Sequence, residues 1–105
     1  MTIYKITPRA LWDEAVLRGS FTGAPVDIAD GFIHFSTAAQ VHETAARHFR
    51  GVEDLLLVAV DAEDLGEALR WEPSRGGDLF PHLYGPLPVN LAVSVKPLSE
   101  GLREL

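Results

Sequence analysis

The chain has 105 residues, a formal net charge of −6 and 47% hydrophobic residues, which fits one domain, residues 1–105, with one core. It has no cysteine, which excludes disulfides, thiolate metal sites and a cysteine nucleophile. The negative charge disfavours nucleic-acid binding, which relies on clustered lysine and arginine. No signal-peptide pattern is present, and the longest apolar run, residues 55–60, is far shorter than the roughly 20 residues that cross a bilayer. We therefore expect a cytoplasmic protein with no membrane contact.

The N-terminal segment predicts a strand followed by a helix. Residues 3–6 have strand composition. Thr7 predicts the N-terminal cap of the helix, with Pro8 in the first helical position, where no N–H group is needed. Apolar residues recur at helical spacing through residue 17, and Gly19 predicts the end of the helix.

A turn-rich segment and a polar strand follow. Residues 20–30 show no helical periodicity and predict a loop anchored by Phe21, Val26 and Ile28. Residues 31–36 have strand composition, and alternation places His34 and Ser36 on one face. His34 is therefore either a half-buried histidine bonded to the main chain or part of a functional site.

The next segment predicts a second helix whose start favours an anion. The sequence Thr-Ala-Ala-Gln matches the capping-box pattern, which predicts a helix that begins at Ser36 or Thr37 and ends before Gly51. Its free N–H groups should face the end of the preceding strand. His42 and His48 are six residues apart and do not share a helical face, so we expect surface histidines there and no metal.

The second half of the chain predicts mainly strands. The apolar run at residues 55–60 is typical of a strand that is buried on both faces. Residues 61–66 predict a turn or one short helical turn, residues 69–72 a short strand, and residues 89–96 a strand that buries its valines and leucine. Strands cluster late and do not alternate with helices, so the pattern predicts a compact α+β domain with two helices.

Residues 71–88 combine prolines and glycines with polar and aromatic side chains, which predicts an ordered loop that lines a pocket. The alternative is a crossover that its aromatic residues pin to the core. Arg75 either grips an oxyanion in a bidentate manner or forms a salt bridge with Glu72 or Asp78. The candidate ligand-binding residues of this segment are Trp71, Ser74, Arg75, Gly76, Gly77, Phe80 and Tyr84.

Three blocks of sequence carry a resemblance to a known family. They are D-G-F-I-H-F-S-T at residues 30–37, the segment at residues 58–66, and residues 71–87, which contain W-E-P-S-R-G-G and F-P-H-L-Y-G-P-L. With them the chain resembles, over nearly its whole length, an uncharacterised bacterial family known as domain of unknown function 952. That family resembles a minimal member of the ADP-ribosyltransferase-like superfamily, which implies split mixed or antiparallel sheets that grip NAD in the cleft between them.

The superfamily resemblance implies roles for residues outside the loop. The strand with His34 is similar to the histidine-containing strand of the RNA 2′-phosphotransferase branch, which ends in a small hydroxyl residue. This implies ligand-binding roles for Ser36 and Thr37. The first strand is similar to the one that carries the nicotinamide-side motif, where this chain has Lys5 and Thr7.

The chain departs from that superfamily in its catalytic acid. Toxin-like members carry a catalytic glutamate on a late strand, whereas residues 89–96 contain no acid and Glu72 is the only nearby carboxylate. Three functions therefore compete. The first is an ADP-ribosyl-type transferase that binds NAD or an ADP-ribosylated small molecule, with His34, Glu72 and His82 as candidate catalytic residues. The second is a non-catalytic module that binds a nucleotide-like small molecule, and the third is a metal hydrolase built from the two histidines and Asp78 or Glu72, which the residue spacing disfavours.

The polar residues of the two site segments should meet in space. We expect one cleft formed by His34, Ser36, Arg75 and His82. Tyr84 should pack against Trp71 or Phe80 at the rim of this cleft. The expected partner is a small molecule, and the pattern predicts no particular oligomeric state.

Overall fold

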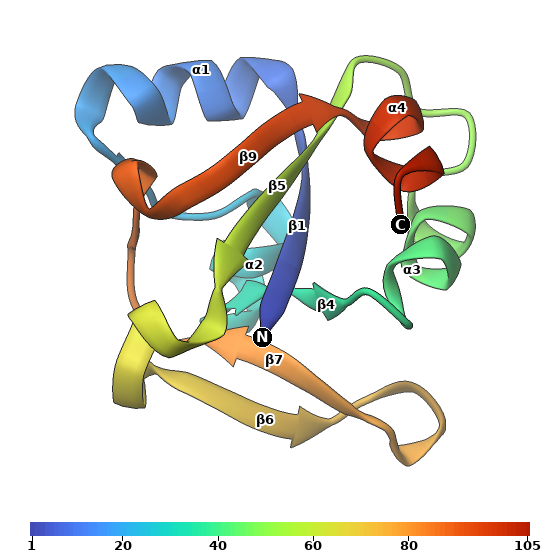
Figure 1. Ribbon diagram of the computed structural model, residues 1–105. Helices are drawn as coiled ribbons and strands as arrows, with labels where there is room; N and C mark the ends of the chain where they lie inside the picture. The colour runs from blue at the N-terminus through green and yellow to red at the C-terminus, as the bar shows by residue number, and fades with distance from the viewer.

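The computed structural model describes the backbone of all 105 residues and every side chain except that of Arg75 (Figure 1). The strands are β1 (Thr2–Pro8), β2 (Ser20–Phe21), β3 (Ile33–His34), β4 (Ser36–Thr37), β5 (Leu55–Asp61), β6 (Leu69–Pro73), β7 (Leu79–Leu83), β8 (Leu87–Pro88) and β9 (Ala92–Pro97). The α-helices are α1 (Arg9–Arg18), α2 (Pro25–Asp30), α3 (Val41–His48) and α4 (Leu98–Arg103). Short 3₁₀ helices are η1 (Ala62–Ala68), η2 (Arg75–Gly77) and η3 (Val89–Leu91).

The strands form three antiparallel sheets. The first has four strands in the order β4-β1-β5-β9, the second has three in the order β3-β7-β6, and the third pairs β2 with β8. Figure 1 shows α1 above the four-stranded sheet, α3 and α4 to its right, and the β6–β7 hairpin below it. The compact α+β domain agrees with the predicted class. The two extra α-helices, α2 and α4, have six residues each, too few to give a recognisable period.

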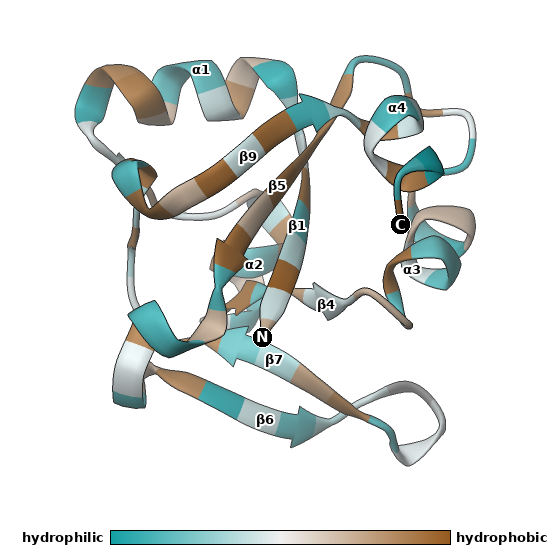
Figure 2. Cartoon of the chain, viewed as in Figure 1, coloured by the Kyte–Doolittle hydropathy of each residue, from teal (hydrophilic) through white to brown (hydrophobic). Residues whose placement is uncertain are grey.

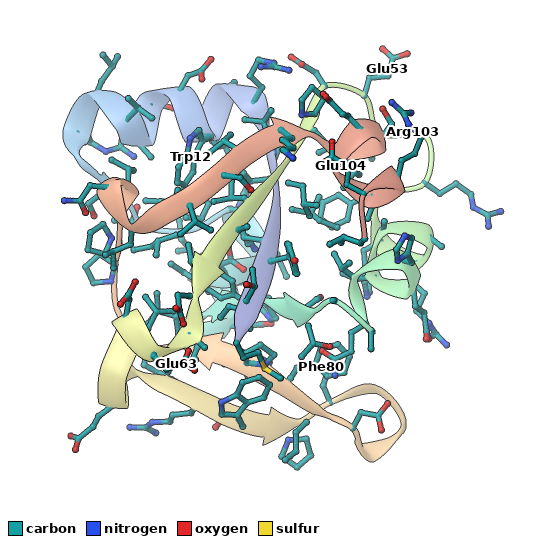
Figure 3. The ribbon with its side chains drawn as sticks, in the orientation of Figure 1. Trp12, Glu53, Glu63, Phe80, Arg103 and Glu104 are labelled. Atoms are coloured by element: carbon teal, nitrogen blue, oxygen red, sulfur yellow. The ribbon has the colours of Figure 1, made fainter. Side chains whose placement is uncertain are left out.

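The hydrophobic core lies on both faces of β5. Residues 55–60 are all buried, which confirms the predicted central strand. Alternate side chains of β5 pack with Trp12 of α1 on one face and with Val41 of α3 on the other. Figure 3 labels Trp12 beneath α1. In the part of the chain that the structure describes, no helix is both long and apolar enough to cross a membrane.

Two predictions for the N-terminal third are wrong. Thr7 does not cap a helix, because β1 pairs with β5 as far as Leu55 and α1 begins only at Arg9, without a side-chain cap. Residues 20–30 are not a loop throughout, since Pro25 starts α2. The predicted anchors Val26 and Ile28 lie on the exposed side of this short helix.

The predicted second helix begins later than expected. Residues 38–40 form a turn, and α3 starts at Val41, not at Ser36 or Thr37. The Gln40 side chain accepts a hydrogen bond from the Thr37 N–H group at 3.0 Å, so the capping residues close a turn. The predicted helix start at residues 36–37, from which the anion site was inferred, is therefore wrong, and the preceding strand is interrupted at Phe35.

Two predictions for the C-terminal half also need correction. Residues 71–88 are mainly the β6–β7 hairpin and the two residues of β8, not a long loop. On β9 the valines face outward: Val93 is 64% exposed and Val95 is 40% exposed. The β5–β9 register shifts between Ala59 and Val60, which leaves Val93 without a partner, but Val95, which pairs with Val58 in regular register, is exposed as well. Figure 2 shows hydrophobic segments, in brown, along β9.

Candidate functional site

A cavity lies where the chain passes from one sheet to the other. β3 pairs with β7 in the three-stranded sheet, and β4, one residue later, pairs with β1 in the four-stranded sheet. The cavity beside this step has a volume of about 490 Å³ and is bounded by β1, β3, β4, β7, α2 and α3. Its aromatic wall consists of Tyr4, Phe35, Phe49 and Phe80, the last labelled near β7 in Figure 3. A space of this size and character suits a small organic ligand.

The Asp27 carboxylate is the hub of the polar groups beneath this cavity. Asp27 is only 1% exposed, and its two oxygens accept hydrogen bonds from the Lys5 ammonium at 2.9 and 2.8 Å. The Ala24 N–H group donates at 2.8 Å and the His34 N–H group at 3.1 Å. The Nδ1 atom of His34 lies 2.6 Å from the same carboxylate. Asp27 thereby ties β1, α2 and β3 together.

The ionisation of Asp27 follows from these contacts. Burial alone would raise the pKa of Asp27, but the hydrogen bond from His34 and the charge of Lys5 outweigh it and lower the pKa from 3.8 to about 2. Burial lowers the pKa of Lys5, and the adjacent carboxylate opposes that fall. Asp27 is thus an anion at neutral pH, with hydrogen bonds to both of its oxygens.

The other ring nitrogen of His34 contacts a second carboxylate. Its Nε2 atom lies 2.9 Å from an oxygen of Asp30, the last residue of α2. The ring also packs against Phe32, with centroids 4.5 Å apart, and against His82 at 5.5 Å. His34 and Asp30 both line the cavity.

A second histidine–carboxylate pair stands beside the first. Nδ1 of His82 lies 2.8 Å from Oε1 of Glu72, and the Tyr84 hydroxyl donates to the same oxygen at 2.8 Å. These bonds, that of His82 first, lower the pKa of Glu72, and the bond to Glu72 raises the pKa of Tyr84. The Arg70 guanidinium lies 4.5 Å from the Tyr84 ring centre. Since Nδ1 of His82 is held by Glu72, Nε2 is the ring nitrogen left for the cavity.

The structure brings together six of the predicted site residues. The cavity is lined by Lys5, His34, Ser36, Ser74, Phe80 and His82. Glu72 lies next to it through its bond to His82. The side chain of Arg75, predicted to bind an oxyanion, lies outside the described residues.

The other predicted residues do not line the cavity. They are Thr7 of β1, Thr37 of β4, Trp71 of β6, Gly76 and Gly77 at the hairpin tip, and Tyr84 after β7. Trp71 precedes Glu72 in β6, and successive side chains of a strand point to opposite faces, so Trp71 projects from the face opposite to Glu72. Tyr84 packs on Phe32 at 5.3 Å and on Arg70, which corrects the predicted contact with Trp71 or Phe80.

Three residues of the site were missed in the sequence. Asp27 and Asp30 fall in the segment interpreted as a loop, and Phe32, which packs against His82, was not among the candidates. A helical reading of residues 25–30, with Pro25 in the first turn and an acid three residues after Ala24, was the available signal. Within the described residues, no group of three histidine or acidic side chains is arranged to hold a metal ion.

The arrangement defines the class of molecule: a small α+β domain with an aromatic-walled cavity and two carboxylate-held histidines. The chain matches the family described as "Protein of unknown function (DUF952)" over residues 6–95, and it belongs to that family. No match was found among curated proteins.

Solved structures of one protein are similar over most of the chain. The crystal structure of protein CC0527 from Caulobacter crescentus is 50% identical, with a TM-score of 0.91, and the alignment covers 98% of this chain and 99% of that one. The solution NMR structure of CC0527 is 55% identical, with a TM-score of 0.82 and coverage of 91% and 83%. These likenesses support the fold described above.

Proposed function

We propose that the cavity binds NAD or another ligand that contains ADP-ribose, and that the protein is an ADP-ribosyl-type transferase. The observation that carries the proposal is the position of the cavity, at the point where two antiparallel sheets separate between β3 and β4. The superfamily that the chain resembles grips NAD in a cleft between split sheets. The aromatic wall suits a planar ring, and the hydroxyl groups of Ser36 and Ser74 suit ribose or phosphate oxygens.

In this proposal the catalytic groups are His82 and Glu72, the second histidine–carboxylate pair. NAD supplies a ribosyl bond whose cleavage releases nicotinamide. Glu72 orients His82 through Nδ1, so Nε2 is placed to take the proton of an acceptor group as a general base. Oε2 of Glu72 is left for a developing positive charge, because the bonds from His82 and Tyr84 both end on Oε1. The low pKa of Glu72 keeps this group anionic.

Binding and catalysis are tested together. Isothermal titration with NAD, ADP-ribose and nicotinamide measures binding, and chromatography measures nicotinamide release from NAD. His82→Gln should leave binding within a few-fold and reduce nicotinamide release about 100-fold or more, the range for loss of a general base. His42→Gln is the matched control, because His42 is exposed on α3 and does not line the cavity. The transferase proposal fails if neither NAD nor ADP-ribose binds.

A non-catalytic binding module is the second candidate. It is favoured by β9, which carries no acidic residue, and by the use of Glu72 Oε1 for two internal hydrogen bonds. This candidate predicts that ADP-ribose binds while nicotinamide release stays at the background rate of the His82→Gln variant.

A further inference from the structure

The two carboxylates that contact His34, those of Asp27 and Asp30, differ in burial and in the number of their polar contacts. Asp27 is 1% exposed and is also bonded to Lys5 and to two main-chain N–H groups. The Asp30 side chain is 49% exposed, and its contact with His34 Nε2 at 2.9 Å is the one polar contact it makes among the described residues. Asp27 is therefore fixed, whereas Asp30 can leave at small cost.

We propose that Asp30 masks an oxyanion-binding position on Nε2 of His34, and that a phosphate or carboxylate group of the ligand displaces it. The two carboxylates lie within ion-pair distance of the two ring nitrogens of His34, so Asp30 occupies the position beside Nε2 at which an acceptor oxygen would sit when that nitrogen carries a proton. An incoming oxyanion presents the same acceptor to Nε2 as Asp30 does. Asp27 meanwhile holds Nδ1 and keeps the ring in place for the exchange.

The surroundings of His34 fit an oxyanion once Asp30 has moved. His82 lies beside it, with ring centroids 5.5 Å apart, and its free Nε2 is a second donor when protonated. Ser36, whose hydroxyl is hydrogen-bonded to that of Thr44 at 2.9 Å, lines the same cavity. Asp30 also lies three residues after Asp27 on α2, where like charges repel. When Asp30 leaves, the negative charge of the bound oxyanion takes the place of its charge.

This inference rests on the proposed function, because that function places the ligand in this cavity. The test uses inorganic pyrophosphate, which is a simpler probe than NAD. Inorganic pyrophosphate is titrated into the wild type, Asp30→Asn and Asp13→Asn, at one ionic strength. Asp13→Asn makes the same change in net charge as Asp30→Asn. Asp13 is exposed on α1, which does not line the cavity, so this variant is the control. Asp30→Asn should bind pyrophosphate about three- to tenfold more tightly than the wild type, because a neutral amide competes less well for Nε2. Asp13→Asn should change affinity less than twofold.

NMR separates unmasking from a general change of charge. In the wild type, pyrophosphate should shift the side-chain carboxyl signal of Asp30 and the Nε2 signal of His34, and should leave the carboxyl signal of Asp27 in place. Equal affinities of Asp30→Asn and Asp13→Asn, an unmoved Asp30 signal, or no pyrophosphate binding to any variant would each overturn the masking. If pyrophosphate behaves as expected but ADP-ribose does not bind, the masking stands and the transferase proposal falls.

Discussion

The buried ion pair between Lys5 and Asp27 gives the sharpest test of how this fold is held together. Asp27→Asn leaves the Lys5 ammonium, which is 4% exposed, without a counter-ion. Removal of one partner from a buried pair costs about 3–5 kcal/mol of unfolding free energy. The same change at Asp54, whose bond to Arg9 at 2.8 Å is exposed, should cost less than about 1 kcal/mol.

The pH dependence of this difference identifies its cause. The folded-state pKa of Asp27, about 2, lies below its ordinary value of 3.8, so its charged form stabilises the fold above about pH 4. This stabilisation, about 2 kcal/mol from the size of the shift, is lost as the pH falls from 4 toward 2. Urea denaturation of the wild type and Asp27→Asn from pH 7 to pH 2 should therefore show the two curves converging on the acid side. Equal stabilities at pH 7, or a difference that stays constant down to pH 2, would refute the role given to Asp27.

Three further predictions concern packing and the second histidine pair. Gly101→Ala should lower the free energy of unfolding by about 1–3 kcal/mol, because the added Cβ would lie 2.7 Å from Leu57 Cδ2; thermal melting measures it. Val93→Thr should change stability by less than about 0.5 kcal/mol in urea denaturation, because this side chain is already exposed, and a larger loss would place it in the core. Tyr84→Phe should raise the pKa of Glu72 toward its ordinary value, as followed by carboxyl NMR, because one of the two hydrogen bonds that lower this pKa is removed.

The strands that local composition defines were predictable, and the elements that depend on distant contacts were not. β5 is a continuous apolar run, so its burial on both faces follows from the sequence. The exposure of Val93 and Val95 depends on what covers β9, which is an edge strand of its sheet, and alternation along β9 cannot reveal this. α2 gives no helical period because it is only six residues long.

The same division applies to the site. His34 and Ser36 could be grouped because alternation along one short segment places them on one face. Asp27 could not be found in this way, because it lies in the short helix α2 and its partner Lys5 is 22 residues away, on β1. The local signals of residues 25–30 indicate a helix start but not a partner for Asp27, since a buried ion pair is specified by tertiary structure alone.

Pro81 explains why a cavity forms at this point of the fold. It lies in β7, the middle strand of the three-stranded sheet, where proline is rare because it lacks the N–H group of the ladder. Its carbonyl accepts a hydrogen bond from the Phe35 N–H group at 3.0 Å, but proline cannot return the second bond that such an antiparallel pair exchanges. The β3–β7 ladder therefore ends at His34, and the chain is free to cross to β1 as β4. A proline that looked like loop composition in the sequence thus ends the pairing between β3 and β7 beside the space that His34 and His82 share.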